Sequence, residues 1–181
     1  MAPALNRHAR LAAYVAAVQG AVGAVPDDAH LAFVETLLSS GQIVVAGRGR
    51  SGMVAAAFAR RLGQMGLRAW GLDDSTVPRL GHGDTLVACT GSGTTPTVLS
   101  LMRTARSGEA RVLVVTRSPA PAELAADVTI ALPLPASSTI FPLGTLFEAS
   151  LLAYLDQVVV DLIAALGATE SDLGARHTNL E

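Results

Sequence analysis

The sequence predicts an α/β protein in which a five-stranded parallel sheet lies between two layers of helices. Short, continuously apolar segments recur along the chain, and stretches of helical length separate them. Two of these segments run directly into glycine-rich loops, and hydrophobic residues make up 50% of the chain. Strands that are apolar along their whole length are buried on both faces, which is typical of parallel sheets covered by helices.

The first 40 residues predict two helices. Apolar residues recur at helical spacing between Leu11 and Val25, and polar residues interrupt the run. This pattern indicates an amphipathic helix, because a signal peptide would have a more continuous apolar centre. Pro26-Asp-Asp28 then supplies a break and an N-cap, and a second helix runs to about Ser40 and ends at Gly41.

Residues 41–132 predict the sheet, and residues 144–181 a long helix with a tail. The expected strands are 42–46, 67–71, 85–89, 111–115 and 128–132. Helices follow the first strand, to about Gln64, and the third, to about Ser107, and a loop over 133–142 leads to a helix over 145–166 and an irregular end. At 181 residues, with no linker or repeat, residues 1–181 are expected to form a single domain.

Composition excludes several classes of function. The net charge is −2, so no basic surface indicates nucleic-acid binding. All 13 basic residues are arginine, which excludes Schiff-base catalysis and a P-loop NTPase. No continuous apolar run approaches the roughly 20 residues that span a bilayer, so we expect a cytoplasmic protein that does not bind membranes. Cys89 is the single cysteine and is expected to be a buried apolar residue.

Thr90-Gly-Ser-Gly-Thr-Thr95 is the stronger of two predicted phosphate-binding loops. Its glycines let backbone N–H groups approach an oxyanion, and its hydroxyls add donors. The following helix contributes its positive end. We therefore expect phosphate contacts from Thr90, Ser92, Gly93, Thr94 and Thr95; the alternative is a plain strand-to-helix turn with a hydroxyl cap.

Gly47-Arg-Gly-Arg-Ser-Gly52 is the second loop. It lacks the third spaced glycine of a dinucleotide fingerprint, although Asp73 and Asp74 lie near where ribose recognition would fall, so nicotinamide binding stays a minor alternative. Gly49, Arg50 and Ser51 suit a sugar hydroxyl or phosphate better. In a flavodoxin-like strand order, 2-1-3-4-5, both loops face one crevice.

Glu148 and His177 are the candidate proton-transfer groups. Pro142-Leu-Gly-Thr-Leu-Phe-Glu148 opens the last long helix, and the chain ends in Arg176-His-Thr-Asn-Leu-Glu181. The alternative interpretation is that Glu148 is a glutamate that stabilises a helix start. No pair of histidines has the spacing of metal ligands, so we expect no metal site.

These motifs resemble the SIS (sugar isomerase) domain superfamily and, within it, the 6-phospho-3-hexuloisomerase family. The glycine-rich loops are general to the superfamily, whereas the segment ending in Glu148 and the terminal Arg-His-x-Asn-Leu-Glu are specific to this isomerase. The resemblance covers essentially the whole chain. It implies a three-layer fold and a homotetramer, with a dimer as the alternative and with sites built across subunits.

The resemblance also implies an intramolecular oxidoreductase that interconverts D-arabino-hex-3-ulose 6-phosphate and D-fructose 6-phosphate without a cofactor. The family's usual role is formaldehyde assimilation in the ribulose monophosphate pathway, formaldehyde detoxification, or pentose supply in reverse. A cis-enediol mechanism needs one base for both carbons, assigned to Glu148, and a group that shuttles the oxygen-bound proton, assigned to His177.

Two departures from the family pattern keep alternatives open. Thr94 stands where the family usually has a glutamate, and Asp73-Asp-Ser-Thr-Val77 replaces a Gly-Glu-Thr-like segment. An isomerase for another phosphosugar, such as arabinose 5-phosphate, is therefore a second hypothesis. A non-catalytic sugar-phosphate-binding module is a third, although such a module would need neither Glu148 nor His177.

Overall fold

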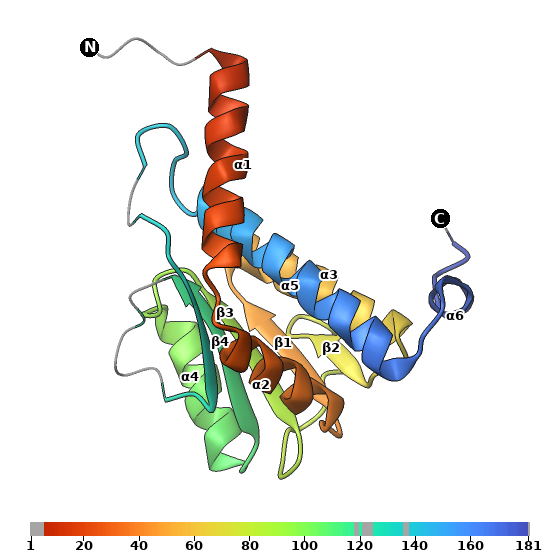
Figure 1. Cartoon of the computed structure of the whole chain (residues 1–181). Coiled ribbons are helices and arrows are strands. Elements are labelled where there is room, and N and C mark those ends of the chain that lie inside the picture. The colour runs from red at the N-terminus through yellow and green to blue at the C-terminus, as the bar shows by residue number, and fades with distance from the viewer. Residues whose placement is uncertain (1–5, 118–119, 121–124, 136–137, 181) are drawn as a thin grey trace.

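The computed structural model describes residues 6–117, 120, 125–135 and 138–180. Its centre is a parallel sheet of five strands in the order β2-β1-β3-β4-β5, as predicted (Figure 1). The edge strand β2 is shorter than expected, because it pairs with β1 over three residues only. The strands are β1 (Ile43–Gly47), β2 (Ala69–Gly71), β3 (Thr85–Thr90), β4 (Arg111–Arg117) and β5 (Val128–Leu132).

Helices cover both faces of the sheet unequally. Ile43 and Val45 face a large core that is shared with α2, α3, α5 and part of α1, whereas Val44 and Ala46 face a smaller core under α4. Alternate side chains of a strand point to opposite faces, so one apolar strand supplies both cores. The helices are α1 (Arg7–Gly23), α2 (Asp27–Leu38), α3 (Gly49–Gln64), α4 (Pro96–Ser107), α5 (Thr145–Leu166) and α6 (Glu170–Ala175).

Helix α5 is the central helix of the larger core. Leu151, Leu155 and Val158 are almost completely buried there. Among the described residues, α5 is the one helix long and apolar enough, by length and composition alone, to cross a membrane. Glu148, Asp156 and Asp161 interrupt its apolar run, and its inner face packs inside the protein as core helices do.

The end of the chain differs from the predicted irregular tail. Residues Glu170–Ala175 form the short helix α6, because Thr169 and Asp172 make a reciprocal capping box. The Thr169 backbone N–H donates to Asp172 Oδ2 at 2.8 Å, and the Asp172 N–H donates to Thr169 Oγ1 at 3.2 Å. A threonine followed three residues later by an acidic residue is a recognisable helix-start signal, and the prediction overlooked it.

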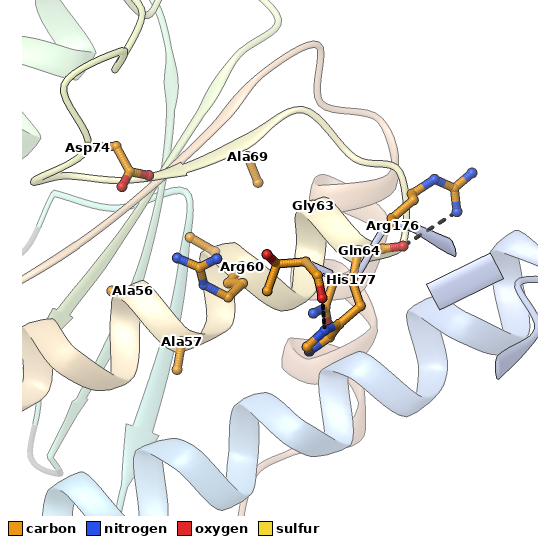
Figure 2. Close-up of a pocket in the computed structure, with 11 residues that line it drawn as sticks. Ala56, Ala57, Arg60, Gly63, Gln64, Ala69, Asp74, Arg176 and His177 are labelled. Carbon is orange, nitrogen blue, oxygen red and sulfur yellow. Dashed lines mark hydrogen bonds between the residues drawn. The ribbon is translucent and has the colours of Figure 1, made fainter. Parts of the chain in front are cut away.

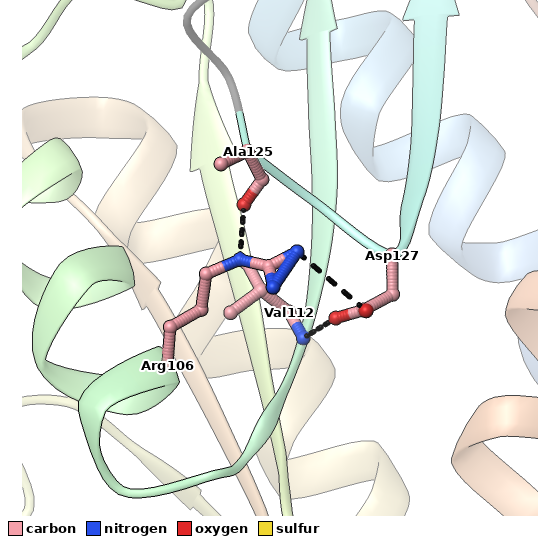
Figure 3. Close-up of polar contacts among 4 residues, drawn as sticks. All are labelled: Arg106, Val112, Ala125 and Asp127. Carbon is pink, nitrogen blue, oxygen red and sulfur yellow. Dashed lines mark hydrogen bonds and ion pairs between the residues drawn. The ribbon is translucent and has the colours of Figure 1, made fainter.

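Polar contacts join strand β5 to its neighbours (Figure 3). Asp127 Oδ2 accepts a hydrogen bond of 2.7 Å from the Val112 N–H, and Asp127 Oδ1 lies 3.6 Å from Arg106 Nη2. Arg106 Nε also donates to the Ala125 carbonyl at 2.8 Å. One arginine of α4 therefore holds the segment that leads into β5.

Candidate active site at the carboxyl edge of the sheet

The two glycine-rich loops leave the sheet side by side. Gly47 at the end of β1 is in register with Cys89, one residue before the end of β3, so both loops lie at the point where the strand order reverses. A Cβ on Gly47 would lie 2.8 Å from the Ser51 carbonyl oxygen, and Gly49 has a φ of 57°. The turn that brings Arg50 and Ser51 onto the start of α3 therefore requires glycine at both positions.

The hydroxyls of the second loop form a connected group. Thr90 Oγ1 and Thr95 Oγ1 are 3.0 Å apart, and Ser92 Oγ accepts from the Thr94 N–H at 3.2 Å and from Thr94 Oγ1 at 3.1 Å. Ser92 and Thr94 are exposed, and Gly93 has a φ of 69°. Thr95 stands at the N-cap of α4, so the loop's hydroxyls gather at the positive end of that helix.

Glu148 is held in the first turn of α5, and its carboxylate faces Arg50. Arg50 Nε lies 3.0 Å from Glu148 Oε2, and 13% of the Glu148 side chain is exposed against 65% of the Arg50 side chain. Oε2 is buried and accepts no hydrogen bond from the described residues. The Arg50 N–H is therefore close enough to form an ion pair with Oε2 but does not point at it well enough to form a hydrogen bond. A buried carboxylate oxygen with unused acceptor capacity calls for an explanation, and a catalytic role is one such explanation.

His177 lies away from this group. It lines a surface pocket of about 390 Å³ with Arg60, Gly63 and Gln64 of the second half of α3 (Figure 2). Arg176 Nη1 donates to the Gln64 carbonyl at 3.4 Å, which holds the tail there. Gly63 follows Arg50 by 13 residues in α3, or about 20 Å of helix. The structure therefore does not bring His177 and Glu148 of one chain together.

The other polar residues near the crevice have different surroundings. Asp73 and Asp74 follow β2 at the same edge of the sheet. Asp73 pairs with Arg48 at 3.6 Å, and Asp74 accepts a hydrogen bond from the Gly71 N–H at 2.9 Å. Away from the crevice, His30 of α2 is partly buried, and its Nε2 lies 2.6 Å from Asp161 Oδ2 of α5. Within the described ranges, no three histidine, cysteine or acidic side chains form a group that could hold a metal ion.

Sequence reasoning did not identify Gly144 and Phe147 as members of the site. A Cβ on Gly144 would meet the Glu148 carboxylate, and the Phe147 ring packs against Gly91 of the Thr90–Thr95 loop. The available signal was spacing: Gly144 precedes Glu148 by four residues and therefore lies beside it on the helix surface.

Comparison with known proteins shows the family of this chain. Residues 36–160 match the SIS domain family, so the chain belongs to the SIS domain family. A Bacillus subtilis 3-hexulose-6-phosphate isomerase is 33% identical over 80% of this chain and 83% of its own length. The Methanocaldococcus jannaschii protein of the same name is 30% identical over 81% of each chain.

A solved structure has the same architecture along the whole chain. It is a Methanococcus jannaschii protein whose crystal structure was described as inferring a function of 3-hexulose-6-phosphate isomerase. The two structures superpose with a TM-score of 0.84 at 25% identity, covering 98% of this chain and all of the other. Family, fold and named relatives define the class as phosphosugar isomerases with the SIS fold.

Proposed function

We propose that this protein interconverts D-arabino-hex-3-ulose 6-phosphate and D-fructose 6-phosphate. The observation that carries the proposal is the convergence of a phosphate-type loop and a shielded carboxylate at one edge of the sheet. Arg50, at the start of α3, contacts Glu148, and Phe147 beside Glu148 packs on the loop that follows β3. A phosphate held at Thr90–Thr95 would place the carbon chain of a sugar near Glu148.

In the proposed mechanism Glu148 removes the proton from C2 of the 3-ketose. The C2–H electron pair forms the C2–C3 double bond of a cis-enediol, and the C3 carbonyl oxygen takes a proton. Glu148 then returns its proton to C3, while the O2 proton leaves and the C2 carbonyl forms, so the reaction needs no external reductant. The Arg50 guanidinium, beside the base and largely exposed, supports negative charge on the enediol oxygens.

His177 is assigned to the proton shuttle of a neighbouring chain. Within its own chain it lines a pocket beside Gly63, which is about 20 Å of helix away from Arg50. A symmetric oligomer gives every site the same partner surface, so a tail displaced from its own site can serve the next one. The proposed assembly is a homotetramer, in which each active site contains Glu148 from one chain and His177 from a neighbouring chain.

Thr94 supports one alternative substrate. Its neutral hydroxyl hydrogen-bonds to Ser92 where the family usually has a carboxylate, so the loop itself carries no acidic group. Isomerisation of another phosphosugar, such as arabinose 5-phosphate, is therefore the second candidate function. It keeps the same phosphate loop and the same base.

The deciding experiment offers both substrates to the purified protein. Fructose 6-phosphate formed from the 3-hexulose phosphate is measured in a coupled assay, and ribulose 5-phosphate formed from arabinose 5-phosphate is measured in parallel. The proposal expects a kcat/KM for the hexulose phosphate at least about 100-fold above that for the pentose phosphate. The reverse order selects the second candidate, and binding of both ligands without turnover indicates a binding module.

A further inference from the structure

Gly144 is a glycine whose backbone does not need one. Its φ and ψ are −87° and 8°, a region that every residue adopts. The residue before it, Leu143, has the positive φ of 55° that favours glycine and is 98% exposed. At position 143 the backbone favours glycine, but the sequence has leucine there. The glycine stands instead at position 144, where the backbone does not require one. The backbone of this turn therefore does not explain Gly144.

The space above Gly144 holds the Glu148 carboxylate. A Cβ at position 144 would lie 2.6 Å from Glu148 Oε1 and 3.1 Å from its Cδ, closer than atoms in van der Waals contact. On the other side, Arg50 Nε lies 3.0 Å from Oε2. The carboxylate is therefore seated between the bare Cα of Gly144 and the guanidinium of Arg50.

We propose that Gly144 is a positioning residue, whose missing side chain fixes the orientation of the Glu148 carboxylate toward the substrate. This inference rests on the proposed function, in which Glu148 is the base. A methyl group at position 144 would be accommodated by movement of the flexible end of Glu148, at little cost to folding. The same movement would take the base away from C2 and C3, and a displacement of about 1 Å at a reacting group can cost about 100-fold in rate.

The test compares Gly144→Ala with Gly20→Ala, a helical glycine at which an added Cβ would have nothing within 4 Å. Gly144→Ala is expected to lower kcat about 10- to 100-fold and to leave KM within about twofold. Its Tm is expected to fall by no more than about 2–4 °C. A kcat within threefold of wild type overturns the proposal, and so does a loss confined to KM.

A second comparison separates positioning from a general effect on the turn. Glu148→Asp shortens the side chain by one methylene and leaves room for the new methyl group. Gly144→Ala is therefore expected to lower kcat by less than about threefold in the Glu148→Asp background. An undiminished loss in that background would show that Gly144 does not act through the carboxylate, and would overturn the proposal.

A crystal structure of Gly144→Ala tests the geometry without turnover. The expected result is a Glu148 Oε1 displaced from its wild-type position while the Thr90–Thr95 loop stays in place. If the wild-type protein isomerises neither sugar but this displacement is seen, the proposed function fails and the steric relationship holds. If the carboxylate does not move, the positioning proposal fails whatever reaction the protein catalyses.

Discussion

Gly91 and Phe147 are packed so closely that a Cβ on Gly91 would lie 2.9 Å from Phe147 Cδ1. Gly91 belongs to the loop that follows β3, and Phe147 is the residue before Glu148 in α5. Phe147 is 4% exposed, so its ring has little room to move. This contact sets the distance between the proposed phosphate-binding loop, Thr90–Thr95, and the helix that carries the proposed base.

Gly91→Ala is expected to displace the phosphate loop from α5. Overpacking of this kind typically costs about 1–3 kcal/mol of folding free energy. We also expect weaker binding of fructose 6-phosphate, measured by calorimetry together with the Tm. Phe147→Leu, which removes the ring atoms in the way, should restore binding in the double variant. If the double variant binds no better than Gly91→Ala, the contact does not position the loop.

Glu148→Gln is expected to lower kcat by about 100- to 10,000-fold, which is the usual contribution of a positioned base, with little change in KM. The amide keeps the shape of the side chain but cannot take a proton from carbon. Glu35→Gln, at an exposed position in α2, is the matched control and should leave both constants unchanged. Activity of Glu148→Gln within threefold of wild type would remove Glu148 from the mechanism.

Subunit sharing predicts complementation between two inactive variants. Glu148→Gln protomers keep the tail, and a variant truncated after Gly174 keeps Glu148 but lacks His177. Mixed oligomers should regain part of the activity, because some sites receive an intact Glu148 and an intact tail from different chains. The measurement is kcat per site after mixing and reassembly. Mixed oligomers that stay inactive would show that His177 does not act across subunits.

The buried thiol of Cys89 is expected to lower the free energy of unfolding at alkaline pH. Burial raises the pKa of its thiol from 9.0 to about 12. Below pH 9 both states keep the proton and the stability is fully present. Above pH 9 the unfolded chain loses a proton that the folded chain retains, so the free energy of unfolding should fall by up to about 1.4 kcal/mol per pH unit toward pH 12.

Cys89→Ala tests this assignment in denaturant titrations at pH 8, 9.5 and 11. The free energy of unfolding of the variant should fall less steeply with pH than that of wild type. The difference in slope should correspond to the release of close to one proton on unfolding. A decrease remains, because burial also raises the pKa of Tyr154. The chain has no lysine, so no lysine side chain contributes to titration in this range. Equal slopes in the two proteins would contradict the role of Cys89.

Much of the fold could be predicted because its signals are local. Apolar runs ending in glycine-rich loops predicted the strands, and the helix over Thr145–Leu166 was predicted with its bounds. The strand order was predicted to be flavodoxin-like, and the structure confirms it, so the loops after β1 and β3 lie together. The same local patterns placed Glu148 at a helix start, but they did not say which loop lies beside it.

The sequence by itself predicted each described helix and strand except α6, and it predicted the edge of the sheet where a ligand would bind, because hydrophobic periodicity and turn-forming residues are local properties of the chain. Only the tertiary structure decided which distant side chains meet. It paired Arg50 with Glu148 across 98 positions of sequence, packed Phe147 on Gly91, and placed His177 beside the second half of α3. These contacts depend on how α3 and α5 pack on the sheet, and no local pattern encodes that packing.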